Sequence, residues 1–502
     1  MATARKPVRL TRRGARGRLV AGVIVLACAG CTVGPDFRTP DVPTAKRYTT
    51  SLDPPAIALP GATLPTLVPG GDIPAEWWTM FGSSALDTLV ARAFAASPTL
   101  AQATARLAQA EHEQRARTGA IEYPALNATL GVNRQQVDPA TIGFPEAPVP
   151  GPFTLYSVGV QVSYTLDVFG GTRRELEALA AEVDYQRYQL EAARLTLAAN
   201  VAVTAIRRAG LRAQIGATQL IVEAQRRQLD IVEQRYALGG VALLDVENQR
   251  TLLAQTESAL PPLVAAHAQA EHLLAIYTGA APGEAELPAL TLAELHVPAQ
   301  LPLSLPSELA RQRPDIRASE ALLHKASANV GVATANLYPR ITLSASAAPT
   351  QTSLSDLVSS GVNIWSIGAN LLQPVFRGGE LTERKEAAVA TFEQAEAAYR
   401  ETVLQGLRNV ADVLRALEGD TRSLAKRSAQ ATHAEAAYRI ALGRYDDGGT
   451  SQLDVLDAER QRLAAALARV EAEADRYADT VALLQALGGG WWTVADPAPA
   501  SR

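Results

Sequence analysis

The sequence contains little cysteine, few aromatic residues and few long apolar runs. Cys28 and Cys31 are the only cysteines among 502 residues, and aromatic residues make up 5% of the chain. After position 31 no segment reaches the about 18 to 20 uninterrupted apolar residues that a membrane-spanning helix needs. The composition therefore excludes a disulfide-rich scaffold and a helical membrane domain after that position.

The N-terminus lacks acidic residues altogether. Seven basic side chains and no acidic one precede Cys31, an apolar run covers residues 19–29, and Gly30 stands next to the cysteine. The run is too short for a bilayer span, and this order predicts a signal peptide. It resembles a bacterial lipoprotein signal, cleaved so that Cys31 carries lipid. The third position before the lipidated cysteine is usually leucine in such signals, but here it is Cys28. Cleavage before Cys28 therefore stays open as an alternative. A plain signal peptide is another alternative.

Basic residues are also scarce beyond the leader. Without it, 40 basic residues stand against 51 acidic ones, which argues against nucleic acid as a partner. No zinc-ligand spacing, phosphate-binding glycine loop or GxSxG motif occurs, and the six histidines are scattered. We therefore expect no catalytic residues, no metal, no cofactor and no enzymatic activity.

An internal repeat organises the rest of the chain. "RYALGGVALLDVENQ" from Arg235 matches "RYDDGGTSQLDVLDA" from Arg444 at a constant offset of 209. "VFGG" at 168–171 echoes "VFRGG" at 375–379, and "YPALNATLGV" from Tyr123 echoes "YPRITLSASA" from Tyr338. The predicted divisions are a signal peptide (1–30), an N-terminal extended segment (31–82), a first repeat (83–279), a Pro-rich linker (280–306), a second repeat (307–489) and a tail (490–502).

Each repeat contains one very long helical segment. Residues 172–238 and 380–446 are proline-free runs of 67 residues with apolar residues three and four positions apart. Each helix would be about 100 Å long, which predicts an extended bundle or tunnel. Both runs end at a glycine pair suited to a helix C-cap. Residues 451–454 are predicted to cap the returning helix, and Pro261-Pro262 to kink or break its counterpart.

Four shorter segments alternate apolar and polar residues. They cover 125–133, 155–166, 341–346 and 365–371. Such alternation is typical of a transmembrane β-barrel or of a soluble sandwich, and a secreted, lipidated chain favours the barrel. Four strands cannot close a barrel, because known single-chain bacterial barrels begin at about eight, and open edges cannot face lipid. Copies of the chain must therefore share a barrel, with their number left open.

Several motifs together resemble one family. "CTVGPDFRTP", "WWTMFGSSALDTLV", "RPDIRASEALLHKASANVGVATANLYPRITLSAS", "LDVLDAERQRL" and "LLQALGGGW" are similar to the TolC-like outer-membrane factors, in particular to the NodT-type lipoproteins of RND efflux systems. The resemblance implies an α+β membrane protein: a homotrimer with a 12-stranded outer-membrane β-barrel, four strands per chain, continued by a periplasmic α-helical barrel. It also implies a periplasmic adaptor (membrane fusion protein), an inner-membrane RND transporter and passive export of drugs or other small molecules. Thr32 replaces the aspartate of inner-membrane retention, which agrees with outer-membrane sorting.

The resemblance places a periplasmic gate after the second glycine pair. Leu453, Asp457 and Arg460 are spaced to share one helix face, and in a trimer they would form rings. We expect Leu453, Asp454 and Asp457 to form the gate, with Arg460 as a salt-bridge latch. The alternative is that Asp454 only caps the helix and the other two are surface charges. In the first repeat Asn248 and Thr251 replace Asp457 and Arg460, so one hairpin per chain would supply the second acidic ring.

The glycine pairs are the expected contacts with the adaptor. By the same resemblance Gly239, Gly240, Gly448 and Gly449 would meet the adaptor's own hairpin, and simple C-capping is compatible with that role. Trp77-Trp78 could anchor at a membrane interface, but a packing role is favoured. Two other functions stay open: an outer-membrane conduit for type I protein secretion, and a lipid-anchored periplasmic coiled-coil protein without a pore.

Overall fold

The computed structural model describes residues 32–41, 45, 47–49, 66–143, 145–146, 148–355 and 364–493. The predicted signal peptide, Cys28, Cys31 and residues 494–502 of the predicted tail lie outside this range. The chain divides into two compact units, each described by itself. The sheet unit comprises the described part of Met1–Thr39 with Gln109–Asp184 and Ala321–Ala397, and the bundle unit comprises the described parts of Pro40–Ala108, Tyr185–Glu320 and Ala398–Arg502.

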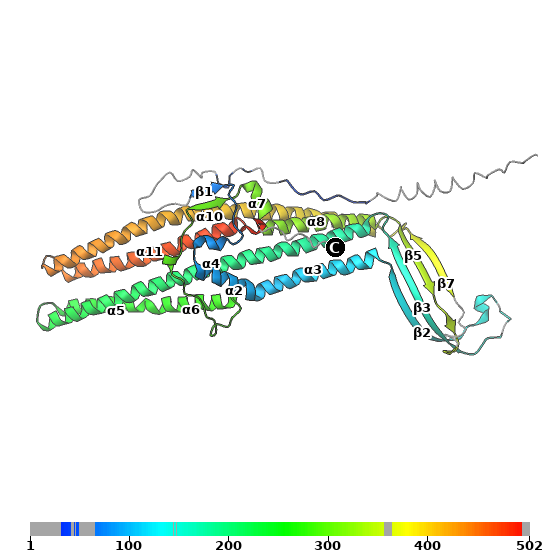
Figure 1. The fold of residues 1–502 in the computed structure, drawn as a ribbon, viewed down its shortest axis with the longest axis horizontal. Helices are drawn as coiled ribbons and strands as arrows, with labels where there is room; N and C mark the ends of the chain where they lie inside the picture. Colours follow the sequence, from blue (N-terminus) through cyan, green and yellow to red (C-terminus); the bar gives the residue numbers. More distant parts are fainter. Residues whose placement is uncertain are drawn as a thin grey trace, which may run out of the picture. The chain divides into compact units, whose positions relative to one another are not determined.

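The sheet unit contains the four predicted strands, which confirms their positions (Figure 1). They form an antiparallel sheet in the order β2-β3-β5-β7, with two-residue β6 (Thr350–Gln351) beside β3. The bounds are β2 Ala125–Gln135, β3 Phe153–Leu166, β5 Arg340–Ala347 and β7 Trp365–Leu372. Within the described part of the chain, β2 and β7 are the two edges.

The register of this sheet separates apolar from polar rows. One row across the four strands is Leu126, Val162, Ala345 and Ile367. The adjacent row is polar throughout, with Asn127, Gln161, Ser346 and Ser366. Because successive side chains of a strand point to opposite faces, the sheet has one apolar and one polar face.

Two 67-residue helices follow the strands of the two repeats. They are α4 (Gly171–Ala237) and α10 (Glu380–Asp446), within one residue of the predicted bounds. Both end in the same C-cap, in which Gly239 (φ 76°) and Gly448 (φ 73°) adopt the left-handed conformation that glycine tolerates. Gly240 N donates to Arg235 O (2.8 Å) and Gly449 N to Arg444 O (2.7 Å), the six-residue closure of a Schellman motif. The predicted C-capping by glycine is confirmed.

The returning helices differ between the repeats as the prolines predict. The second is α11 (Gln452–Ala486), a single helix of 35 residues. The first is divided at Ala259 into α5 (Leu243–Ser258) and α6 (Leu260–Tyr277), because Pro261 and Pro262 cannot donate backbone hydrogen bonds and are tolerated only in a first turn.

The helices before the strands are divided in the same way. The first repeat has α2 (Ser84–Ala96) and α3 (Pro98–Glu122), and the second has α7 (Pro306–Gln312) and α8 (Pro314–Ala335). Ser97 and Arg313 lie between the pieces in extended conformation, as expected of residues that precede proline.

The bundle unit also contains a small sheet that the sequence did not indicate. Strand β1 (Thr66–Pro69) runs parallel to β4 (Gln300–Leu303), so the segment expected only to link the repeats pairs with the N-terminal segment. Leu301 is fully buried. A short 3-10 helix η3 (Leu292–Glu294) precedes β4. Residues 280–306 therefore contribute to the core as well as joining the repeats.

Tryptophan and glycine residues fill the core of the bundle unit. Trp77 and Trp78, in η1 (Trp77–Phe81), are buried in the core, which confirms the packing role. Gly488, Gly489 and Gly490 all have positive φ, and a Cβ on Gly490 would lie 2.3 Å from Ile73 O. The glycines of "LGGGW" thus let this backbone approach Ile73 before η4 (Trp491–Thr493).

Three aspartates on α10 and α11 form an acidic cluster in the bundle unit. Burial raises the pKa of Asp479 to about 7, and a hydrogen bond with Asp420 and the negative charges of Asp420 and Asp475 act in the same direction. The folded chain therefore holds this proton to a higher pH than the unfolded chain does.

Asp479→Asn is expected to remove a pH dependence of stability. The stability that protonated Asp479 contributes is full at low pH and is lost as pH rises through about 7. Thermal unfolding followed by helical circular dichroism should therefore show a melting temperature a few degrees above wild type at pH 8, with the two proteins converging near pH 4. Asp412→Asn, an exposed position on α10, is the control. An unchanged pH profile in Asp479→Asn would contradict this assignment.

Candidate functional site

The turn between α10 and α11 carries the residues predicted for the gate. Ser451 and Asp454 form the predicted capping box: Asp454 N donates to Ser451 Oγ (3.3 Å), and Asp454 Oδ2 accepts from Ser451 N (3.1 Å). Thr450 Oγ1 also donates to Asp454 Oδ2 (2.6 Å). The hydrogen bonds that the Asp454 carboxylate accepts hold its pKa below the ordinary value, and the bond from Thr450 has the largest effect. Asp454 is therefore an ionised helix cap.

Leu453, Asp457 and Arg460 lie on one face of the first turns of α11, with Leu453 and Arg460 exposed and Asp457 half-exposed. The Leu453 side chain is 61% exposed. Arg460 pairs with Asp457 one turn earlier (Nη2 to Oδ1, 2.6 Å), and Gln461 Nε2 donates to Asp457 Oδ2 (2.7 Å). Both groups are largely exposed, so this pair adds little stability to the single chain. The structure thus places the predicted residues on one surface of α11 and joins Arg460 to Asp457.

The first hairpin has Ala242 in place of Ser451, so it keeps only the aspartate half of this cap, and its surface differs. Asp245 Oδ2 accepts from Ala242 N (3.0 Å), as the repeat leads one to expect. Leu238, Leu243 and Leu244 are exposed by 88%, 52% and 67%, so this tip is apolar. The second tip instead carries Asp446 and Asp447 beside its glycines.

An arginine joins the two hairpin ends within the bundle unit. Arg235 Nη2 lies 3.9 Å from Asp446 Oδ1, and its guanidinium carbon lies 5.0 Å from the centroid of the Tyr445 ring. Its counterpart Arg444 donates to Gly449 O of its own turn (3.2 Å). The repeat therefore uses equivalent arginines differently, one between hairpins and one within a hairpin.

The hairpin interiors contain polar side chains that the sequence did not single out. Gln225 and Gln249 are fully buried, and Gln452 and Glu459 are nearly so. Both side-chain polar atoms of Gln225 and of Gln452, and one carboxylate oxygen of Glu459, have no hydrogen-bond partner in the described protein. Burial raises the pKa of Glu459, against the positive charge of Arg462. A buried unpaired polar group costs roughly 1–3 kcal/mol, so the hairpin ends are less tightly held than an apolar core would be.

The segment that follows Cys31 docks onto the sheet unit. Arg174, whose side chain is 6% exposed, donates to Asp36 Oδ1 (2.6 Å) and Glu177 Oε2 (2.8 Å). The Phe37 ring stacks on His324 with centroids 4.3 Å apart. A Cβ on Gly34 (φ 93°) would lie 2.4 Å from the α-carbon of Gly331, so only glycine fits this approach. Residues 32–37 are therefore held in one register against α4 and α8.

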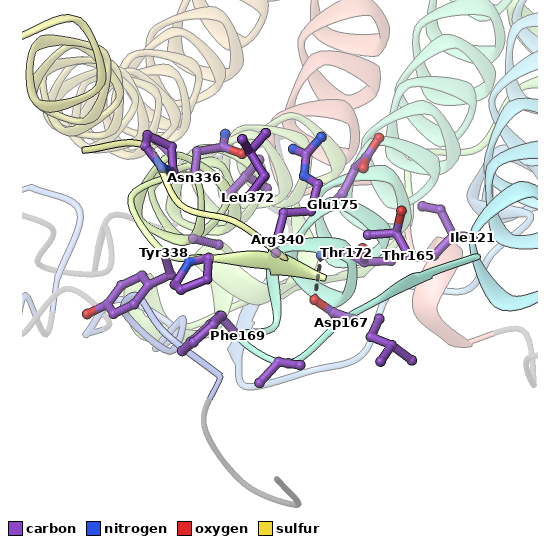
Figure 2. A pocket seen from close by; sticks show the side chains of 18 of the residues that line it. Ile121, Thr165, Asp167, Phe169, Thr172, Glu175, Asn336, Tyr338, Arg340 and Leu372 are labelled. Carbon is purple, nitrogen blue, oxygen red and sulfur yellow. Dashed lines mark hydrogen bonds between the residues drawn. The ribbon is translucent and has the colours of Figure 1, made fainter. Parts of the chain in front are cut away.

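A cavity of about 750 Å³ lies in the sheet unit, where the strands meet the helices (Figure 2). Asp167 accepts hydrogen bonds from Thr172 N (3.1 Å) and Arg173 N (3.0 Å), which caps α4. Arg117 makes two bonds to Glu175 (2.6 and 2.9 Å) and joins α3 to α4. These lining charges therefore hold helices in place.

The described residues contain neither a candidate metal site nor a candidate helical membrane span. In that part of the chain no group of three or more His, Cys, Asp or Glu side chains could hold a metal ion. Within the same residues no helix is sufficiently long and apolar to pass through a membrane.

Comparison of the sequence with known protein families identifies the family of this chain. The family described as outer membrane efflux protein matches residues 89–280 and 305–489. The chain belongs to the outer membrane efflux protein family. It is thus the outer-membrane channel component of an efflux system, and the family is one of channels rather than enzymes. The resemblance to TolC-like factors is confirmed.

Individual relatives agree with this membership. The chain is 33% identical over 422 residues to the pyoverdine export outer membrane protein OpmQ of Pseudomonas aeruginosa, covering 83% of this chain and 87% of the relative. It is 28% identical over 491 residues to nodulation protein T of Rhizobium leguminosarum, covering 96% of each. Among solved structures, the outer-membrane channel OprN matches with a TM-score of 0.81 and 29% identity over 92% of this chain and all of OprN.

Proposed function

We propose that this efflux protein is the outer-membrane part of a tripartite pump. Three copies would close one 12-stranded barrel, and their long helices would continue it as an α-helical barrel in the periplasm. An adaptor would join it to an inner-membrane RND transporter, which supplies drugs or other small molecules for passive export. The observation that carries this proposal is the open four-stranded sheet followed by two 67-residue helices in a member of this family.

The two-repeat division of the chain supports this assembly. The family match falls into two segments, 89–280 and 305–489, which lie within the predicted repeats 83–279 and 307–489 to within two residues. Each repeat supplies two long strands and one 67-residue helix. Three such chains would place six similar units around one axis, which suits a closed tube.

We place the periplasmic gate at the start of α11. Leu453 would form an apolar ring, Asp457 a ring of carboxylates, and Arg460 would hold Asp457 in position through the 2.6 Å ion pair. Asp454 would orient this turn by capping it, as its four hydrogen bonds indicate. The unpaired polar groups inside the hairpin support movement there, because they lower the stability of the closed packing.

The glycine tips would receive the adaptor. Gly239 and Gly448 expose tight turns at the ends of the hairpins, and the flanking residues differ in character. The first tip presents Leu238 and Leu243, whereas the second presents Asp446 and Asp447. An adaptor hairpin with both apolar and basic residues would fit this pair of tips.

Lipid on Cys31 would supplement the barrel as an anchor. Thr32, the next residue, packs against Gly170 immediately before α4, where a Cβ on that glycine would lie 2.6 Å from Thr32 Cγ2. A lipid on the residue before Thr32 would add a second attachment to the membrane.

The gate assignment is tested by conductance. Asp457→Ala with Arg460→Ala should increase the single-channel conductance of the purified protein in planar bilayers severalfold, because the ion pair that orders the constriction is lost. Asn248→Ala with Thr251→Ala, the same positions of the first hairpin, is the matched control and should leave conductance near wild type. Unchanged conductance in the first variant would count against the gate.

The lipid anchor is tested by metabolic labelling. Cys31→Ser should abolish incorporation of radioactive palmitate, because the thiol that receives lipid is removed, whereas Cys28→Ser should keep the label. The opposite pattern would move the anchor to Cys28. Channel conductance of unlabelled Cys31→Ser protein should stay near wild type, because the shared barrel holds it in the membrane.

A further inference from the structure

The charges that line the cavity of the sheet unit do not balance. The described residues of its wall include four arginines and two acidic residues, namely Arg117, Arg340, Arg377, Arg384, Asp167 and Glu175. Both carboxylate oxygens of Glu175 accept from Arg117, and both oxygens of Asp167 accept from backbone N–H groups in the first turn of α4. Each acidic group therefore already has partners for both of its oxygens.

Arg340, which begins β5, differs from the other three arginines of this wall (Figure 2). Within the described part of the chain its guanidinium forms no hydrogen bond or ion pair. Arg377 and Arg384 lie 3.8 and 2.7 Å from the two oxygens of one carboxylate, that of Glu380. The cavity thus has an excess of positive charge, and Arg340 contributes a charge that no described acidic group neutralises.

The alternation of β5 places Arg340 on the polar face of the sheet. Side chains at every second position of a strand point to the same face, so Arg340 shares a face with Thr342, Ser344 and Ser346. Thr342 and Ser344 lie opposite a threonine and a serine of β3, and Ser346 belongs to the polar row. In the proposed barrel this face lines the channel, because the apolar face meets lipid.

The charge occurs in one repeat only. "YPALN" of the first repeat has Ala125 where "YPRIT" of the second has Arg340. Ala125 also lines the cavity, and alternation with Asn127 places it on the polar face as well. The first repeat therefore supplies a neutral position equivalent to that of Arg340.

We propose that Arg340 is a binding position for anionic cargo, with small molecules that carry carboxylate or sulfonate groups as the substrate class. This proposal rests on the channel proposed above and adds a preference among its substrates. A guanidinium presents a planar set of N–H donors that matches a carboxylate, and rings of arginine serve anion-selective pores. Three copies would place three such groups around the channel. An anionic lipid headgroup could supply the same chemistry, but a position on the polar face favours cargo.

Reversal potentials of the purified channel test this preference. In planar bilayers of phosphatidylcholine under a KCl gradient, Arg340→Gln should lower the chloride-to-potassium permeability ratio severalfold. Arg340→Lys is the matched control and should stay near wild type, because it keeps the positive charge. The difference should be larger in dilute salt, because the Debye length falls from about 10 Å at 0.1 M to about 3 Å at 1 M. An unchanged ratio in Arg340→Gln would overturn the proposal.

Block by citrate tests binding of a carboxylate directly. Citrate added to one side of the bilayer should reduce the current through the wild-type and Arg340→Lys channels more strongly than through Arg340→Gln. Equal block of all three would contradict a binding position at Arg340. An effect of Arg340→Gln that appears only when phosphatidylglycerol is added to the bilayer would indicate a headgroup site and overturn the assignment to cargo.

A gain of charge keeps the test decisive if Arg340→Gln does not insert into bilayers. Ala125→Arg adds an arginine at the equivalent position of the first repeat, and it should raise the chloride-to-potassium ratio above wild type and strengthen block by citrate. No change of either quantity in a conducting Ala125→Arg channel would overturn the proposal and leave the proposed function intact. Absence of any channel activity in the wild-type protein would instead contradict the proposed function itself.

Discussion

Unpaired backbone groups on the edges of a four-stranded sheet are the constraint on which the rest of this structure depends. Strands β2 and β7 each have one neighbour in the described chain, and one face of the sheet is apolar. In hydrocarbon each unpaired backbone group costs several kcal/mol, so the sheet cannot enter a membrane as a single copy. In the proposed assembly, strands shared between copies would remove the edges, and the helices that follow the strands would then be arranged around the same axis. In that proposal, closure of the sheet and formation of the tunnel depend on the same assembly.

The two repeats share backbone features and differ in the side chains of their hairpin ends. Both long helices end in the same glycine C-cap, and both return helices begin with an aspartate cap. The second hairpin adds Asp457, Arg460 and the buried Glu459, where the first has Asn248, Thr251 and an exposed Arg250. At these equivalent positions the backbone role is the same and the side chains differ. A gate at such positions would not require a change of fold.

The sequence predicted the parts of the fold that depend on local period and on turn residues. The strands, the two 67-residue helices, the glycine caps, the Ser451–Asp454 box and the break at Pro261 all follow from such signals.

The β1–β4 pair was missed because four-residue strands have too few residues to show a period. The docking of residues 32–37 was missed because it depends on glycine contacts between distant segments. Gln225 and Gln452 gave no signal, since glutamine is ordinary on helix surfaces and only packing reveals that it is buried. The proposed gate residues were predicted from motif position, and the structure shows an ion pair between Asp457 and Arg460.

The proposed passive outer-membrane conduit is tested most directly by substrate accumulation in cells. A strain that lacks this chain should accumulate members of a panel of antibiotics, dyes and metal ions, and the wild-type gene should restore low accumulation, while inhibition of the inner-membrane energy supply should abolish the difference. Equal accumulation with and without the chain, at normal levels of the protein in the outer membrane, would contradict an efflux role.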